Sequence, residues 1–553
     1  MNFAKKLLIP NKWEYLVPAL ATASLLISCL LISGKKFFWN DELLSYYLLS
    51  DPSFAHMLGA FHDKINNTPP LYFILGWLWV RVFGATELSL RLFSSLGMCI
   101  ACVTVWVTLR RTYNFWSASI GTLSVFCTSE LILSQNAEAR MYGLFLAICS
   151  FALLQFDINN SSSQSSRWII CSNACVHAAM VHTHLFGMFY SGAIVCSHIA
   201  IDKYLKIFRP KLYLSIVLSW LSLILYIPSF LNQADAGNPR TWIPSPSLKD
   251  LIDLLIFPPS SFLKLVVLPV LILVSALIFI LYKIEKTQSY QLYPQNQQNF
   301  APEKYLLIFS YAFLSVTILI WIISRTVKPI FLDRYMIPTA VSWSILLAYL
   351  SSRIVYNSLF DEEVDNNSIQ SKFLAAQRQI ILLALTATLL VYPIRYANSL
   401  PKEPLPGLND NKYGDKNLPI VVQSSHDFVQ RLQYSPDPNR YFFILDWQAA
   451  IDNSSGLFSP QEYKNMDALK RNYPELFKNI TKSETFLNKY ERFLVLDYVD
   501  YNKKCTLEPK WENISCPKWL ETRILNNPLY KVKDIGTIEL ENKKILIVQK
   551  RKL

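Results

Sequence analysis

Charged residues are scarce in this chain: Asp, Glu, Lys and Arg make up 17% of its 553 residues, whereas 52% are hydrophobic and 14% are aromatic. The scarcity is local, because several stretches carry no charge over lengths that reach or approach the roughly 17–25 residues a helix needs to cross a bilayer. These stretches are Tyr15–Ile32, Leu265–Leu281, Tyr305–Ile323 and Ile380–Ile394. The composition excludes an ordinary soluble multidomain protein and predicts membrane-spanning helices.

Other sequence features are missing altogether. The chain shows no heptads, no internal repeats of about 20–50 residues and no glycine-rich loop of the kind that cradles phosphates, which argues against a nucleotide-driven transporter. The first apolar run also lacks a small-residue cleavage site, and it is flanked by Lys5/Lys6 and Lys35/Lys36. We therefore expect it to be an uncleaved first span.

Cysteine is rare outside the apolar runs. Of the ten cysteines, only Cys505 and Cys516 lie in a polar segment, and the others are expected to be small buried hydrophobic residues. A disulfide between Cys505 and Cys516 is predicted, and it would place the C-terminal segment in an oxidising compartment.

Basic residues give a net charge of +13, but they occur in short clusters between apolar runs and not on one polar face. This pattern predicts membrane topology and no nucleic-acid partner. If Leu71–Phe83 crossed the bilayer, the basic cluster Lys203–Lys211 would lie outside the cytoplasm. We therefore expect this short aromatic segment to lie at the membrane interface.

The sequence then predicts an α-helical polytopic membrane protein with about eleven spans, juxtamembrane helices and a C-terminal extracytoplasmic α/β domain. The expected spans lie near residues 14–33, 88–109, 115–134, 140–156, 168–182, 185–201, 212–230, 262–282, 304–324, 336–352 and 379–396. An odd count from a cytoplasmic N-terminus places residues 398–553 outside, in agreement with the disulfide argument. Residues 1–397 form the predicted membrane domain, with a first extracytoplasmic loop at 34–87.

The segment after residue 398 changes composition and predicts alternating strands and helices. Strands are expected at Pro419–Val422, Arg440–Leu445, Arg492–Leu496 and Lys544–Val548. A helix capped by a serine is expected at Ser424–Tyr434.

Polar residues at the predicted outer surface are candidates for function, because polar groups at membrane depth are costly. Asp41 and Glu42 form an acidic pair in the first loop, although such a pair also caps a helix that starts at Leu43. The string NNTPPLY at Asn66–Tyr72 closes the same loop and predicts the start of the interfacial helix.

Two further segments lie at the outer ends of predicted spans: the string SQNAEARMYG and the segment His182-Thr183-His184. In SQNAEARMYG, Glu138 and Arg140 are too close in helix phase to face each other, so each is expected to address a partner elsewhere, a structural ion pair being the alternative. His182 and His184 are expected to be satisfied core residues, since two histidines at this spacing bind a metal only with a third ligand. The sequence therefore makes no cofactor certain, and a divalent metal stays an alternative that it does not support.

The last string, RTVKPIFLDRYMIP at Arg325–Pro338, carries three cations just outside the bilayer: Arg325, Lys328 and Arg334. Guanidinium groups suit phosphate oxygens, so we predict a phosphate-binding site. The alternative is that these cations pair with the carboxylates of the first loop.

At these places the chain resembles the glycosyltransferase family 39 group, which includes the protein O-mannosyltransferases, the lipid A aminoarabinose transferases and bacterial relatives of the GT-C fold. The resemblance covers roughly residues 10–400. Its elements are Asp41-Glu42, Pro69-Pro70 with Tyr72, the run Phe83, Gly84, Glu87, Leu90 and Arg91, the string Glu138–Tyr142, Thr183-His184 with Phe186, and Pro329, Phe331, Arg334, Tyr335 and Pro338. Relatives often have SQEAR where this chain has SQNAEAR, and the C-terminal segment does not resemble the MIR modules of eukaryotic protein mannosyltransferases.

The resemblance implies a sugar donor on polyprenyl phosphate, held in membrane lipid, and an extracytoplasmic acceptor that is a lipid, a polysaccharide or a protein. It implies that Asp41 accepts the proton of the acceptor hydroxyl and that the sugar is transferred with inversion in a single displacement. Developing charge on the leaving phosphate would be stabilised by cations, for which the candidates are Arg325, Lys328, Arg334 and Arg140. Glu42 and Glu138 would orient the acceptor or hold those cations, and Tyr142, His184 and Tyr335 complete the expected substrate site.

Two other functions remain open from the sequence. A secondary transporter or flippase would be expected to show internal repeats and ionisable residues near the middle of broken spans, whereas here the charges gather at the outer ends of helices. The second open function is that of a membrane-anchored binding protein without catalytic activity. In a bacterium the chain is expected in the cytoplasmic membrane.

Overall fold

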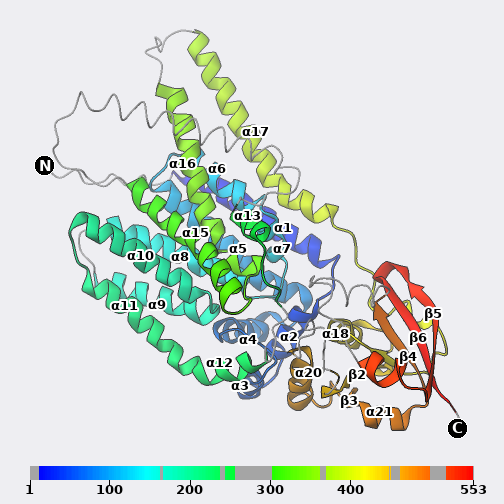
Figure 1. Cartoon of the computed structure of the whole chain (residues 1–553). Helices are drawn as coiled ribbons and strands as arrows, with labels where there is room; N and C mark the ends of the chain where they lie inside the picture. The colour runs from blue at the N-terminus through cyan, green and yellow to red at the C-terminus, as the bar shows by residue number, and fades with distance from the viewer. Residues whose placement is uncertain are drawn as a thin grey trace. The chain divides into compact units, whose positions relative to one another are not determined.

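The computed structural model describes residues 11–161, 166–236, 243–255, 302–360, 369–447, 449, 461–498 and 519–551. The chain divides into two compact units (Figure 1). Unit 1 comprises Met1–Ser33, Arg91–Leu223 and Pro246–Leu400, and unit 2 comprises Gly34–Leu90, Ile224–Ser245 and Pro401–Leu553. The predicted first loop and the predicted C-terminal domain therefore belong to the same compact unit.

Unit 1 is helical. Its long helices are α1 (Leu16–Ser33), α5 (Glu87–Arg110, which begins in unit 2), α6 (Phe115–Phe126), α8 (Tyr142–Ser161), α9 (Arg167–Thr183), α10 (Gly187–Leu205), α11 (Pro210–Leu221), α15 (Pro302–Thr326), α16 (Thr339–Phe360) and α17 (Ile369–Ser399). The shorter elements are η1 (Lys12–Tyr15), α7 (Glu130–Asn136), α13 (Leu248–Leu255) and η3 (Asp333–Met336). Helix α16 packs on α6, α11 on α9, α1 on α17 and α10 on α15.

Six helices in the described part of the chain are long and apolar enough to cross a membrane. They are Lys12–Ser33, Glu87–Arg110, Tyr142–Ser161, Pro210–Asp235, Pro302–Thr326 and Gln379–Ser399. The protein is thus a multi-pass integral membrane protein, as the sequence predicted. The expected span at 262–282 lies outside the described residues, and the count of eleven stays a prediction.

Two expected spans are not uniform α-helices. The segment 115–134 is divided into α6 and α7, and the segment 212–230 passes without a gap from α11 through the 3₁₀ helix η2 (Ser222–Tyr226) into α12 (Ile227–Asp235). Pro228 stands at the start of α12, where its missing N–H cannot continue the hydrogen bonds of the preceding helix. Apolar composition alone did not show these breaks.

The cysteines are buried less uniformly than expected. Cys29, Cys99, Cys102, Cys127 and Cys149 are buried, but three others are exposed: Cys171, Cys175 and Cys196. Their burial was predicted wrongly because they lie on faces of α9 and α10 that unit 1 does not cover. Cys505 and Cys516 lie outside the described residues, so their disulfide stays a prediction.

Unit 2 contains the helices of the first loop, which are α2 (Asn40–Leu49), α3 (Phe54–His62) and α4 (Leu71–Phe83), together with α12. Its other part is an α/β domain with β1 (Ile420–Val422), α18 (Ser425–Tyr434), β2 (Tyr441–Leu445), α20 (Gln461–Asn472), β3 (Ile480–Lys482), α21 (Ser483–Lys489), β4 (Arg492–Tyr498), β5 (Tyr530–Ile538) and β6 (Lys543–Lys550). Helix α4 is 13 residues long, shorter than a bilayer crossing requires.

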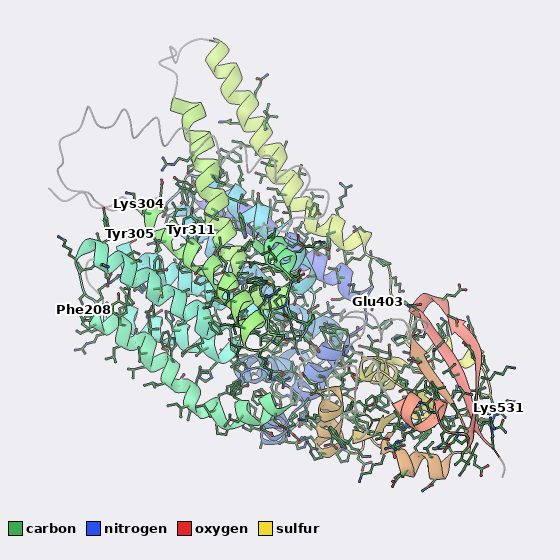
Figure 2. All side chains as sticks on the ribbon, viewed as in Figure 1. Phe208, Lys304, Tyr305, Tyr311, Glu403 and Lys531 are labelled. Atoms are coloured by element: carbon green, nitrogen blue, oxygen red, sulfur yellow. The ribbon has the colours of Figure 1, made fainter. Side chains whose placement is uncertain are left out.

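The sheet has the order β3-β2-β1-β4-β6-β5. Strands β1 to β4 pair in parallel, whereas β6 runs antiparallel to both β4 and β5. The four predicted strands are confirmed as β1, β2, β4 and β6. The sequence missed β3, which has three residues, and β5, whose exposed Lys531 is labelled in Figure 2. Charged residues are typical of such edge strands and hide the strand pattern.

Candidate functional site

His184 lies directly after α9 and is surrounded by aromatic rings in unit 1. Its ring centroid lies 5.0 Å from that of Phe145 and 5.3 Å from that of Phe186. The ring of Tyr142 lies 6.1 Å away and that of Tyr335 lies 5.0 Å away. We call these five residues the ring cluster. It joins three strings that are far apart in the sequence, so the predicted residues Tyr142, His184 and Tyr335 are neighbours.

Phe145 is a member of the ring cluster that the sequence analysis missed. It follows Tyr142 by three residues on α8, and residues three apart lie on the same helix face. That spacing is the signal that would have found it.

Two glycines fix the start of α8, where the ring cluster begins. A Cβ added to Gly143 would lie 2.0 Å from the carbonyl oxygen of Ser94, and one added to Gly97 would lie 2.3 Å from the carbonyl carbon of Gly143. Helices α5 and α8 therefore meet backbone to backbone, which glycine alone permits. The hydroxyl of Ser94 also donates to the carbonyl oxygen of Arg140 at 2.7 Å.

Two arginines supply the positive charge beside the ring cluster. Burial, together with the charges of Arg140 and Arg334, lowers the pKa of His184 to about 3. Its Nδ1 accepts a hydrogen bond from the backbone N–H of Phe186 at 3.1 Å, as a neutral imidazole can. The Arg334 guanidinium lies 6.0 Å from the ring centroid of Tyr335. His184 is therefore a neutral ring in the field of two arginines.

The connection that carries Glu138 and Arg140 is not helical. Helix α7 ends at Asn136 and α8 begins at Tyr142. The N–H of Arg140 donates to the carbonyl oxygen of Glu138 at 2.8 Å, which is a tight turn. The helix-phase argument made from the sequence was wrong at this place, because it assumed a continuous helix.

Arg325, another of the predicted cations, contacts residues outside the ring cluster. Arg325, at the end of α15, donates to the carbonyl oxygen of Pro246 at 3.0 Å and lies 5.5 Å from the ring centroid of Trp321. Arg325 and Lys328 are both exposed, whereas Arg334 is half-buried. The string Arg325–Pro338 therefore brings Arg334 and Tyr335 to the rings, whereas its first residue, Arg325, bonds to Pro246.

His182 and His184 have different partners. The Nε2 of His182 lies 2.8 Å from the hydroxyl of Ser222, while His184 belongs to the ring cluster. Among the residues that the structure describes, no group of three or more His, Cys, Asp or Glu side chains could hold a metal ion.

In unit 2 the two residues of the acidic pair, Asp41 and Glu42, differ in burial at the start of α2. The carboxylate Oε2 of Glu42 accepts a hydrogen bond from the N–H of Trp39 at 3.2 Å, and Glu42 is 1% exposed. Asp41 is only half-buried. The helix begins at Asn40 and not at Leu43, and Glu42 makes the capping hydrogen bond to the N–H of Trp39.

The NNTPPLY string ends the loop as expected, because α4 begins at Leu71 directly after Pro70. Before the prolines, the Asn66 amide donates to the carbonyl oxygen of Thr68 at 2.9 Å, and the Thr68 hydroxyl donates to the Asn66 side-chain oxygen at 3.0 Å. The string is a rigid turn that starts a helix.

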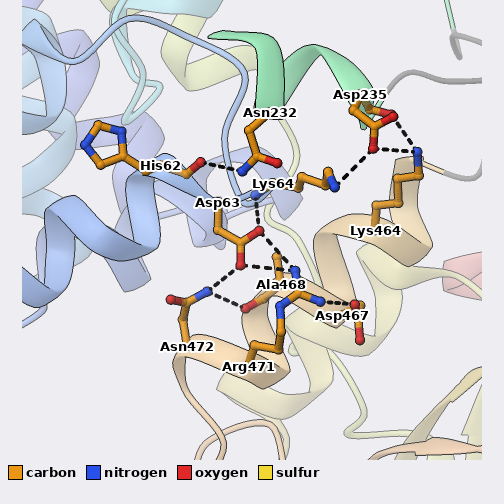
Figure 3. Close-up of polar contacts among 10 residues, drawn as sticks. All are labelled: His62, Asp63, Lys64, Asn232, Asp235, Lys464, Asp467, Ala468, Arg471 and Asn472. Carbon is orange, nitrogen blue, oxygen red and sulfur yellow. Dashed lines mark hydrogen bonds and ion pairs between the residues drawn. The ribbon is translucent and has the colours of Figure 1, made fainter. Parts of the chain in front are cut away.

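A group of ion pairs joins the first loop to α12 and α20, and we call it the loop clamp (Figure 3). The Asp63 carboxylate accepts from Arg471 at 3.0 Å and from Asn472 at 2.9 Å. Burial opposes ionisation of Asp63, but these hydrogen bonds outweigh it and hold the pKa of Asp63 below its ordinary value.

The second half of the loop clamp centres on Asp235 of α12. Its carboxylate lies 3.0 Å from the ammonium group of Lys64 and 3.2 Å from that of Lys464. Hydrogen bonds from these two lysines lower the pKa of Asp235 to about 2. The first loop, α12 and the α/β domain are therefore held together by charges within unit 2.

No family model matches the chain, and no curated protein matches it. Among solved structures, the chain is similar in fold to ArnT from Cupriavidus metallidurans, both bound to undecaprenyl phosphate and in the apo state, at 12% sequence identity. The TM-score is 0.51 for the bound structure, with 97% of this chain and 98% of that chain covered, and 0.53 for the apo structure, with 97% of each chain covered.

The archaeal oligosaccharyltransferase AglB from Archaeoglobus fulgidus is less similar, with a TM-score of 0.45, 13% identity and coverage of 91% of this chain and 72% of that chain. The predicted fold class is confirmed by the ArnT structures. This chain has an ArnT-like fold, with a multi-pass helical membrane part and a C-terminal α/β domain.

Proposed function

We propose that this protein is a membrane glycosyltransferase that moves a sugar from a polyprenyl-phosphate donor to an extracytoplasmic acceptor. The observation that carries the proposal is the ring cluster with Arg140 and Arg334 beside it, in a chain with an ArnT-like fold. One of the similar ArnT structures is bound to undecaprenyl phosphate. Family 39 is the family to which we assign the chain.

In this proposal the cations of unit 1 hold the donor phosphate. Arg140 and Arg334 offer guanidinium forks, which match phosphate oxygens and are always charged. Because His184 is neutral, it adds no positive charge, and the two arginines alone would neutralise the phosphate in this proposal. His184 would contribute an aromatic face and a hydrogen-bonding nitrogen. Arg325 and Lys328 remain candidates for the same anion, and Glu138 for holding a cation.

Asp41 is the general base in this proposal. Glu42 is buried and accepts a hydrogen bond from the backbone at the start of α2, whereas Asp41 is half-buried. A base has to reach the acceptor hydroxyl within about 2.6–3.2 Å, so the more exposed carboxylate is the better candidate. Asp41 would take the hydroxyl proton, the acceptor oxygen would bond to the anomeric carbon, and the donor phosphate would leave with the electron pair of the broken bond.

We also propose that the N-terminus is cytoplasmic and that the α/β domain is extracytoplasmic, as the distribution of basic residues predicts. A reporter fused after Leu553 is then expected to be active only outside the cytoplasm. Activity of that reporter inside the cell would overturn this orientation.

The function is tested by mass spectrometry of polyprenyl-phosphate sugars in a strain that lacks the gene. Loss of a transferase leaves its donor unused, so one lipid-linked sugar is expected to accumulate and to fall again when the parent gene is restored. An unchanged donor pool contradicts the proposal. A flippase is the second candidate, and it would be favoured if the purified protein moves the lipid between leaflets without transferring its sugar.

A further inference from the structure

The segment that leads into α2 is held by the C-terminal domain of the same unit. Residues 36–39 adopt no helix or strand, so their backbone polar groups need partners elsewhere. The N–H of Phe37 donates to the Glu403 carboxylate at 3.0 Å, and the N–H of Glu403 donates to the carbonyl oxygen of Lys35 at 2.8 Å. Glu403, labelled in Figure 2, therefore bonds to Phe37 in this segment and to Lys35 directly before it.

Phe38, three residues before Asp41, has both of its backbone polar groups bonded to α18. Its N–H donates to the hydroxyl of Tyr434 at 3.1 Å, and its carbonyl oxygen accepts from the Gln430 amide at 3.0 Å. Gln430 and Tyr434 are four residues apart on α18 and so lie on one helix face. This face directs the backbone immediately before the acidic pair.

The hydroxyl of Tyr434 also donates to the carboxylate of Glu87, at the start of α5. Its ring lies 4.8 Å from the ring of Phe37. Tyr434 therefore connects the two ends of the first loop through one hydroxyl group. Glu87 belongs to the string that the sequence resemblance singled out without giving it a role.

Helix α18 is itself firmly fixed in the α/β domain. Arg431 is 1% exposed, and its guanidinium pairs with Asp410 at 2.7 Å and with Glu541 at 2.5 Å. Lys543 pairs with Asp427 at 2.5 Å on the same helix. Breaking buried pairs of this kind is strongly unfavourable, so α18 offers a rigid support.

We infer that α18 is a positioning element for the acidic pair, and that Tyr434 and Gln430, acting through Phe38, determine where the Asp41 carboxylate lies. The inference rests on the proposed function, in which Asp41 is the general base. A base displaced by about 1 Å loses on the order of 10²-fold in rate, although the substrate still binds. Tyr434 and Gln430 would therefore act on turnover and not on donor binding.

The test compares Tyr434→Phe with the parent in the full-length protein. Phenylalanine keeps the ring contact with Phe37 and removes the hydroxyl that Phe38 and Glu87 share. We expect kcat to fall about 10-fold, with an unchanged KM for the donor that the deletion strain accumulates, as loss of hydrogen bonds that include a charged partner predicts. Hydrogen exchange of the Phe37 and Phe38 amides is expected to become faster.

Arg471→Ala is the matched control. Arg471 also joins the first loop to the C-terminal domain, but it does so through Asp63, and it is 49% exposed. Its removal is expected to leave kcat within about two-fold of the parent, as for other exposed pairs. Gln430→Ala removes the second bond to Phe38 and is expected to lower kcat as Tyr434→Phe does; it replaces that variant if Tyr434→Phe does not fold.

The outcomes separate the two proposals. If the parent transfers no sugar from the accumulated donor, the proposed function fails, and hydrogen exchange alone decides whether α18 holds the loop. Faster exchange at Phe38 in Tyr434→Phe, but not in Arg471→Ala, supports the positioning role. A parental kcat in an active Tyr434→Phe protein, an equal loss in Arg471→Ala, or unchanged exchange at Phe38 overturns it.

Discussion

The two candidate regions of this protein are each stabilised by a different kind of interaction. In unit 1 the ring cluster rests on aromatic contacts and on a glycine contact between α5 and α8. In unit 2 the first loop rests on hydrogen bonds and ion pairs to α12, α18 and α20. Between the helices of a membrane protein, packing is the main stabilising force. Exposed charged groups, in contrast, can form hydrogen bonds with water when their protein partner is lost. The comparison predicts that packing changes damage unit 1 most and that changes to exposed polar groups of unit 2 are mild, except near Asp41.

The largest effect is expected at Asp41, the proposed base in unit 2. Asp41→Asn removes the proton acceptor and keeps the size of the side chain, so turnover should fall by about 10²–10⁴-fold. Binding of undecaprenyl phosphate should survive, because the phosphate is assigned to cations of unit 1. Sugar transfer and lipid binding are measured separately on purified, folded protein. Transfer within a few-fold of the parent would show that the base is another carboxylate, with Glu42 or Glu138 next.

The next effect is expected at Arg334, the half-buried cation beside the ring cluster. Arg334→Ala removes a guanidinium assigned to the donor phosphate, so binding of undecaprenyl phosphate should weaken by about 10–100-fold, as loss of a charged hydrogen bond predicts. Arg353→Ala is the control, since Arg353 lies on α16 and pairs with Glu303 at 2.9 Å. Equal affinity in both variants would remove Arg334 from the proposed site.

A packing change in unit 1 is expected to reduce stability. Gly143→Ala places a methyl group 2.0 Å from the Ser94 carbonyl oxygen, so overpacking should cost about 1–3 kcal/mol and lower the melting temperature in detergent. Gly192→Ala is the matched control on α10, because its added Cβ would have no atom within 4 Å. Alanine there should be neutral or slightly stabilising. Equal melting temperatures for the two variants would contradict the close contact between α5 and α8.

The smallest effect is expected in the loop clamp. Arg471→Ala should cost less than about 1 kcal/mol at neutral pH, because Arg471 is 49% exposed. The folded pKa of Asp63 is below its ordinary value, so the pair stabilises the fold above the unfolded pKa of about 3.9 and loses this contribution as pH falls further. The difference in melting temperature between parent and variant should therefore shrink from about pH 7 to about pH 3. A difference that grows on acidification would contradict this assignment.

Local signals in the sequence were enough to predict several elements. The prolines before Leu71 gave the start of α4, and Ser424, whose side chain accepts from the N–H of Asp427, was predicted as the cap of α18. The apolar runs gave the multi-pass membrane character. Each of these features depends on a few neighbouring residues, so the amino-acid sequence by itself determined them.

Only the tertiary structure decided which distant residues meet. It brought Tyr142, His184 and Tyr335 into one cluster, and it placed Arg325 against Pro246. It also buried Glu42 while leaving Asp41 half-buried. These contacts depend on how whole helices pack, and no local propensity or spacing records the partner of a side chain many residues away. For the same reason the backbone of Phe38 has its partners on α18, 392 and 396 residues further along the chain.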